Sequence, residues 1–221
     1  MPRNVAALVD RLKQTKRTKQ TFTAAEVERV LRAARRDRLE HAWRLALYGL
    51  RRGEVAGLMW SDINLKAGTL TVRENRVSVD GEAVSSDPKS AMSKRTLPLT
   101  PALVLALKRA KRRQSVERLK AGEGYQASGY LVVNEAGGAL HPETVSDKWD
   151  ELLSAAKVRR IRLHDARHTC GTLLHLEGEP IAKISAWLGH ADPAFTMRTY
   201  VDPQRDELRG TAQALGSVTS L

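Results

Sequence analysis

Hydrophobic and polar positions divide the chain into a polar start, a helical region, a short region of strand character and a long helical end. After the polar and basic residues 1–20, Thr23 and Glu26 have the spacing of a helix capping box, and apolar residues then recur at the helical period. The same period predicts further helices at about 43–49, 54–58, 101–120, 142–156, 164–177, 180–188, 193–200 and 205–218.

The region between the third and fourth predicted helices alternates apolar and polar residues and is rich in β-branched side chains. It predicts strands at 69–72, 76–79 and 96–99, with Asp80-Gly81 as a hairpin turn, and a further short strand is predicted at 130–133. Together these elements predict an α+β fold that is mainly α-helical and has one small antiparallel β-sheet.

The chain is strongly basic, and its positive charge is distributed unevenly along the sequence. The formal net charge is +12 at pH 7; residues 1–38 contribute +7 and residues 108–120 contribute +6, so the rest of the chain sums to −1. Clustered positive charge suits a polyanion such as nucleic acid, because each neutralised phosphate releases counterions. A solvated basic surface is the alternative, and charge alone does not decide between them.

Three features that the sequence lacks indicate the cellular compartment in which the protein is expected. No apolar run is long enough to be a transmembrane helix, and the first residues contain no apolar signal region, so neither a membrane protein nor a secreted one is expected. The single cysteine, Cys170, allows no internal disulfide, which fits a reducing cytoplasm.

The candidate chemistry lies in short motifs around six dispersed residues. These are Arg51 in Gly49-Leu50-Arg51-Arg52-Gly53-Glu54, Lys89 in Pro88-Lys89-Ser90, His164 and Arg167 in His164-Asp165-Ala166-Arg167-His168-Thr169, His190 in Trp187-Leu188-Gly189-His190, and Tyr200. In order and local context they resemble the motifs of the tyrosine recombinases, the phage integrase family, from about Phe22 to the C-terminus. The resemblance implies the catalytic domain of a site-specific DNA recombinase. Such an enzyme cleaves and rejoins strands through a 3′-phosphotyrosyl intermediate, without metal, ATP or another cofactor.

Arg51 and Arg167 occupy the two arginine positions of the family motif. A planar guanidinium suits a phosphodiester under attack, because it gives two parallel hydrogen bonds and stays charged. Taken singly, Arg51 could be a surface arginine and Arg167 a partner in a helix salt bridge; their joint presence favours catalysis. Glu54, three residues after Arg51, is expected either to orient that arginine or to form an ordinary helix salt bridge.

Two histidines complete the predicted phosphate site. His164 lies three residues before Arg167 on one side of a helix, and the resemblance gives it proton handling and phosphate contact. A metal reaction is the alternative, since His164 and His168 are four apart, but Asp165 replaces the glutamate that a zincin helix needs. His190 alone would be a helix cap or core residue; the resemblance implies a hydrogen bond to the scissile phosphate.

The last two motif residues carry the covalent step. Tyr200 follows His190 by ten positions, and the resemblance makes it the nucleophile. Its phenol, with a pKa of ~10, needs a base and neighbouring cations. Lys89 matches the lysine that protonates the leaving 5′ oxygen, although its loop is otherwise basic and Lys94 is a second candidate.

We expect three parts: a basic arm at 1–20, a catalytic domain at 21–203 and a docking helix at 204–221, with no core-binding domain before them. The resemblance implies that the tail packs on a neighbouring protomer in a tetramer on double-stranded DNA, in the cytoplasm of a bacterial host. Docking of the tail on its own domain is the alternative. Two further functions stay open: a DNA-binding accessory protein that has lost catalysis, and a type IB topoisomerase-like enzyme.

Overall fold

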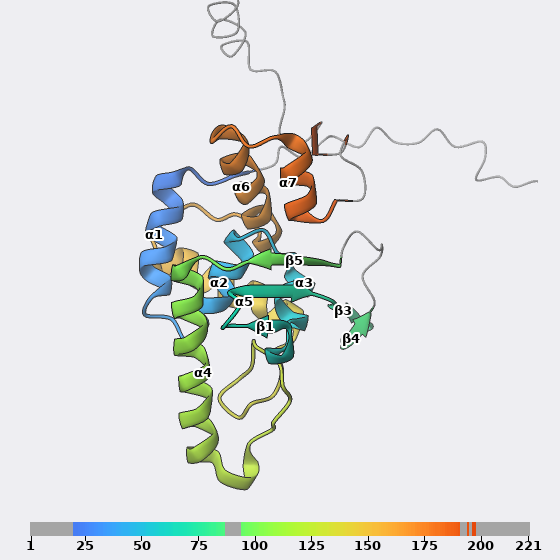
Figure 1. Ribbon diagram of the computed structural model, residues 1–221. Coiled ribbons are helices and arrows are strands. Elements are labelled where there is room, and N and C mark those ends of the chain that lie inside the picture. Colours follow the sequence, from blue (N-terminus) through green and yellow to red (C-terminus); the bar gives the residue numbers. More distant parts are fainter. Residues whose placement is uncertain (1–19, 87–93, 191–193, 195, 198–221) are drawn as a thin grey trace, which may run out of the picture.

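The computed structural model describes residues 20–86, 94–190, 194, 196 and 197. Helices are arranged around two small sheets (Figure 1). The elements are α1 (Ala24–Ala34), α2 (Glu40–Leu47), α3 (Arg52–Gly57), the 3-10 helix η2 (Trp60–Asp62), β1 (Ile63–Asn64), β2 (Thr69–Val72), β3 (Asn75–Val79), β4 (Glu82–Ser86), β5 (Arg95–Pro98), α4 (Pro101–Ala121), the 3-10 helix η4 (Gly122–Gly124), α5 (Pro142–Ala155), α6 (Leu163–Leu176) and α7 (Ile181–Leu188). The α+β, mainly helical prediction is confirmed.

The capping box predicted from Thr23 and Glu26 starts α1. The Thr23 hydroxyl accepts from the Glu26 amide at 3.2 Å, and the Glu26 carboxylate accepts from the Thr23 amide at 2.8 Å. The residue before the cap, Phe22, is buried and donates its backbone N–H to the Thr169 hydroxyl of α6 at 3.0 Å. The start of the described chain is thereby tied to the helix that carries His164 and Arg167.

The prediction of a single sheet was wrong. Antiparallel strands β1, β2 and β5 form one sheet, whereas β3 and β4 form a separate antiparallel hairpin. Asp80 and Gly81, both with positive φ, close this hairpin tightly, so that Val79 pairs with Glu82. The hairpin packs on α3 instead of joining the larger sheet.

The short strand predicted at 130–133 is also absent from the described structure. Tyr130 and Val133 each form one isolated bridge, to Met59 and Ala139. The chain bends at Gly129, which has positive φ, and turns again after Val133, so no ladder of successive pairs can form.

The core packs several helices against one another. α2 packs on α1, α4 and α6, and its Trp43 meets Trp149 of α5 with ring centroids 5.8 Å apart. A second apolar cluster joins α6 to α7 through Cys170, Ile184 and Leu188. In Figure 1, α6 and α7 lie together above β5, while α4 runs downward away from them. Of the helices that the structure describes, none is both long and apolar enough to cross a bilayer.

Candidate active site

The turn between α2 and α3 presents Arg51 as the N-cap of α3. Its backbone N–H, which the helix leaves unused, donates to the Glu54 carboxylate at 2.8 Å. The side chain donates from Nη1 to Glu54 Oε1 at 2.6 Å and from Nη2 to the Gly189 carbonyl at 2.9 Å. The Arg51 side chain is still 32% exposed, so its guanidinium is held in place and remains reachable from solvent.

Arg167 of α6 lies beneath this position and is buried. Its Nη1 donates to the Gly49 carbonyl at 2.6 Å, and its Nη2 donates to the carbonyl of Leu188. Gly49 has a φ of +102°, and a Cβ there would lie 2.8 Å from a methyl group of Leu188, so the turn needs glycine. Two backbone turns from distant parts of the sequence thus orient the second arginine.

Glu54 joins the two arginines. Its carboxylate is buried, binds Arg51 and lies 3.9 Å from Nη1 of Arg167. Burial alone would raise the pKa of Glu54, but the hydrogen bonds and charge of Arg95, followed by the charges of Arg167 and Arg51, lower it to about 2. The ionised Glu54 carboxylate pairs with arginines from three different parts of the chain, so it is more than an ordinary salt bridge at the start of α3.

His164 lies in the first turn of α6, one turn from Arg167, and is exposed. Partial loss of hydration against α6 and its neighbours lowers the pKa of His164 although the residue is exposed, and the positive charge of Arg167 lowers it further, so its neutral form is favoured. Its ring meets that of His168 edge to face, with centroids 4.9 Å apart. Asp165 is engaged by Arg162 through two hydrogen bonds of 2.9 Å. Across the described residues, no group of three or more His, Cys, Asp or Glu side chains is placed to hold a metal ion.

His190 follows Gly189, the C-cap of α7, and is buried. Its Nδ1 lies 2.7 Å from the Thr196 hydroxyl, which fixes the ring. Burial lowers the pKa of His190, and the charges of Arg167 and Arg51 lower it further, to about 3. At neutral pH the ring is therefore uncharged and carries one N–H for donation.

Four of the six predicted residues thus come together in the structure. Arg51 and Arg167 share Glu54, His190 adjoins the carbonyl that Arg51 binds, and the charges of both arginines act on His164. Lys89 and Tyr200 lie outside the described residues, as do residues 1–19 of the arm and the tail at 204–221.

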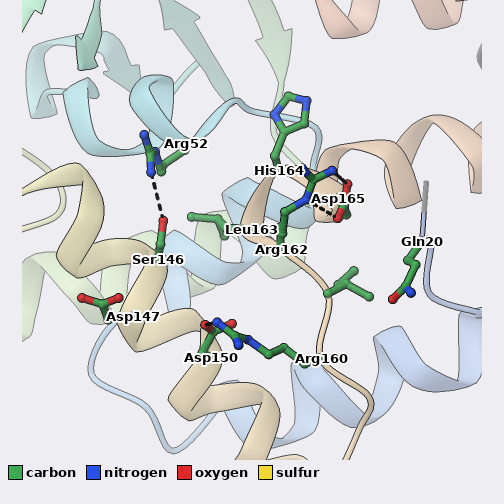
Figure 2. Close-up of a pocket in the computed structure, with 11 residues that line it drawn as sticks. Gln20, Arg52, Ser146, Asp147, Asp150, Arg160, Arg162, Leu163, His164 and Asp165 are labelled. Carbon is green, nitrogen blue, oxygen red and sulfur yellow. Dashed lines mark hydrogen bonds and ion pairs between the residues drawn. The ribbon is translucent and has the colours of Figure 1, made fainter. Parts of the chain in front are cut away.

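A cleft of about 980 Å³ opens beside His164 (Figure 2). Its charged walls contain two internal ion pairs, Arg160 with Asp150 and Arg162 with Asp165. Arg52, next in sequence to Arg51, is exposed at the cleft and reaches Ser146 of α5 at 3.5 Å. The lining residues are Gln20, Arg52, Ser146, Asp147, Asp150, Arg160, Ile161, Arg162, Leu163, His164 and Asp165.

Comparison with known sequences agrees with the motifs. The sequence profile described as the phage integrase family matches residues 20–207. The chain belongs to this family. A tyrosine recombinase XerC-like protein of Caldanaerobacter subterraneus subsp. tengcongensis is 31% identical over 194 residues, which cover 82% of this chain and 50% of that protein. The ICEBs1 integrase of Bacillus subtilis is 29% identical over 154 residues, covering 70% of this chain and 42% of that protein. The chain therefore spans about half the length of these relatives.

Solved structures show the same fold. The Tn1549 transposon integrase, in complex with transposon right end DNA, superposes with a TM-score of 0.75 at 20% identity, covering 93% of this chain and 68% of that one. The XerA recombinase superposes with a TM-score of 0.67 at 24% identity, covering 92% of this chain and 66% of that one. The family assignment made from the motifs is confirmed.

Proposed function

We propose that this chain provides the catalytic part of a site-specific recombinase that cleaves and rejoins double-stranded DNA. The observation that carries the proposal is the convergence of two guanidinium groups from distant segments on one buried carboxylate, beside two histidines. Such an array can stabilise the charge that develops on the non-bridging oxygens of a phosphodiester under attack. A scaffold that only binds DNA would not require this arrangement.

In the proposed reaction the hydroxyl of Tyr200 attacks the scissile phosphorus. A 3′-phosphotyrosyl bond forms, the bond to the 5′ oxygen breaks, and Lys89 protonates that leaving oxygen. Arg51 and Arg167 stabilise the charged phosphorane, with His164 as proton acceptor and His190 as hydrogen-bond donor. The 5′-hydroxyl of a partner strand then reverses the step, so the energy of the broken bond is kept in the covalent link.

A structural neighbour bound to DNA supports the proposed DNA partner. XerH, a structural neighbour with a TM-score of 0.60 at 19% identity, is a site-specific recombinase bound to its palindromic difH substrate. We infer that this chain likewise acts on duplex recombination sites, and as a tetramer in the cytoplasm of a bacterial host. We also propose that the catalytic domain extends from residue 21 to residue 203, between the basic arm and the docking helix.

A nicked suicide substrate tests the function. The nick lets the short strand downstream of the scissile phosphate diffuse away, so a covalent protein–DNA adduct accumulates on a denaturing gel. Wild-type protein should give this adduct in EDTA as well as in Mg²⁺, and Tyr200→Phe should bind DNA and give none.

Three results would change the assignment. DNA binding without adduct would favour the accessory protein, and relaxation of supercoiled plasmid without strand exchange would favour the topoisomerase. Dependence on added metal would favour the metal reaction considered for His164 and His168.

A further inference from the structure

The C-terminal end of α7 is held by arginines from three different elements. Successive carbonyl groups at residues 187–189 accept hydrogen bonds from Arg95, Arg167 and Arg51 respectively. The contact from Arg95 joins its Nε to the Trp187 carbonyl at 2.8 Å. Two of these three arginines belong to the predicted catalytic set, and Arg95 does not.

Arg95, the first residue of β5, also binds Glu54 through both terminal nitrogens of its guanidinium. Its Nη1 donates to Oε1 at 3.1 Å and its Nη2 to Oε2 at 2.9 Å, so both oxygens of the carboxylate are bound. The Arg95 side chain is 7% exposed, compared with 32% for Arg51. Because the Arg95 side chain is largely buried and bound to Glu54 and the end of α7, it is much less accessible to a DNA phosphate than Arg51 is.

We propose that Arg95 is a positioning residue of the cleavage reaction, which holds Glu54 and the end of α7 in register so that Arg51, Arg167 and His190 share one geometry. The proposal rests on the proposed function. Its physical basis is that a planar fork can bind a carboxylate on two sides while its Nε holds a third acceptor in a fixed direction. A lysine keeps the charge but cannot hold all three oxygens at once.

The charge on Glu54 also depends on Arg95. Among the partners that lower the pKa of this buried carboxyl, Arg95 is the strongest. Without Arg95, the charges facing Glu54 are those of Arg51 and Arg167, with neutral His190 beside them. Burial, which raises the pKa of Glu54, is then opposed by two arginines instead of three. Without Arg95 the pKa of Glu54 should rise towards the pH range of the assay described below. Protonation of Glu54 would then remove the ion pairs that hold Arg51 and Arg167.

The test compares Arg95 with an arginine in a similar ion pair elsewhere. Arg109 of α4 binds both oxygens of Glu40 at 2.7–3.0 Å, and Glu40 is itself buried. Arg95→Lys, Arg95→Gln, Arg109→Lys and Arg109→Gln are assayed for duplex affinity, thermal unfolding and the single-turnover rate of adduct formation at saturating nicked DNA. Arg95→Lys should keep its DNA affinity within about threefold and lose ~10- to 100-fold in rate. The Arg109 variants should keep the wild-type rate at temperatures where they are folded.

A pH profile separates positioning from simple loss of stability. The rate of Arg95→Gln should fall further as the pH is lowered from 8 to 5, because Glu54 becomes protonated; the wild type should lack this step. Adding Glu54→Gln to Arg95→Gln should remove the step, since nothing is left to titrate at that position.

Each outcome decides the matter. A wild-type rate and pH profile in Arg95→Lys and Arg95→Gln would overturn the proposal while leaving the proposed function intact. If both Arg95 variants are unfolded while the Arg109 variants fold, Arg95 is a core residue and the proposal is also overturned. Absence of adduct from the wild-type protein would instead reject the proposed function, and the role of Arg95 with it.

Discussion

At the scale of single residues, the two motif arginines have different tasks although they share a carboxylate. Arg167 is buried and bound to two backbone carbonyls, so it is part of the scaffold as well as of the proposed phosphate site. Arg51 is partly exposed, and its Nη2 contact to the buried Gly189 carbonyl is only partly buried. A substitution at each position should therefore affect stability and catalysis in different proportions.

Replacement by lysine makes this measurable. Arg51→Lys should lower the rate of adduct formation by ~10²-fold, because the bidentate fork is lost, while the free energy of unfolding changes by less than about 1 kcal/mol. Arg167→Lys should lower the rate at least as much and also cost about 1–3 kcal/mol of stability, because a buried carbonyl loses its donor. Urea unfolding and single-turnover cleavage measure the two effects. Equal destabilisation by both substitutions would contradict the distinction.

At the scale of elements, the local signals were readable in the sequence and the long-range contacts were not. The capping box at Thr23 and the turn at Asp80-Gly81 depend on residues close in sequence, and both are present. The contacts of Arg95 are with residues 41 and 92 positions away, and the only sequence signal was its place in a basic loop before a predicted strand. The separation of the β3–β4 hairpin from the main sheet was missed for a similar reason, since it depends on packing against α3.

That packing has a specific requirement at Gly53, in the first turn of α3. A Cβ on Gly53 would lie 2.0 Å from the Asn75 side chain and 2.5 Å from the Arg76 carbonyl of β3. Helix propensity alone would make Gly53→Ala stabilising by up to ~1 kcal/mol, but overlap with β3 costs ~1–3 kcal/mol and should decide the sign. We expect net destabilisation and slower cleavage, because Arg51 is the cap of the displaced helix.

Gly124→Ala is the matched control for this prediction. A Cβ at Gly124 meets nothing within 4 Å, so the free energy of unfolding should change by no more than ~0.5 kcal/mol. Thermal or urea unfolding of the two variants gives the comparison. Gly53→Ala as stable and as active as the wild type would show that α3 and β3 can separate without consequence.

At the scale of the whole molecule, the sequence segment with the +6 charge divides into two faces of α4. Arg109 is bound to Glu40, and Arg113 donates to the Arg38 carbonyl at 2.5 Å, so part of the charge serves the fold. Lys108 and Arg112 are exposed and, within the described part of the chain, form no ion pair. The net charge of +6 for residues 108–120 therefore overstates the positive charge on the surface of α4 that is available to DNA. Arg52, by contrast, is exposed and lines the cleft beside His164.

The salt dependence of DNA binding can decide which of these surfaces the duplex contacts. Each phosphate neutralised on a duplex adds about 0.9 to the slope of log affinity against log salt concentration. Arg52→Gln should reduce that slope by roughly 0.9 for any duplex sequence, because it removes one phosphate contact at the cleft. Arg112→Gln removes the same charge from α4 and should leave the slope unchanged if the duplex lies along the cleft. Fluorescence anisotropy with a labelled duplex, titrated at several salt concentrations, gives both slopes. A slope lowered by Arg112→Gln and unaffected by Arg52→Gln would move the DNA path from the cleft to α4, since the two variants have the same net charge and differ in where it was lost.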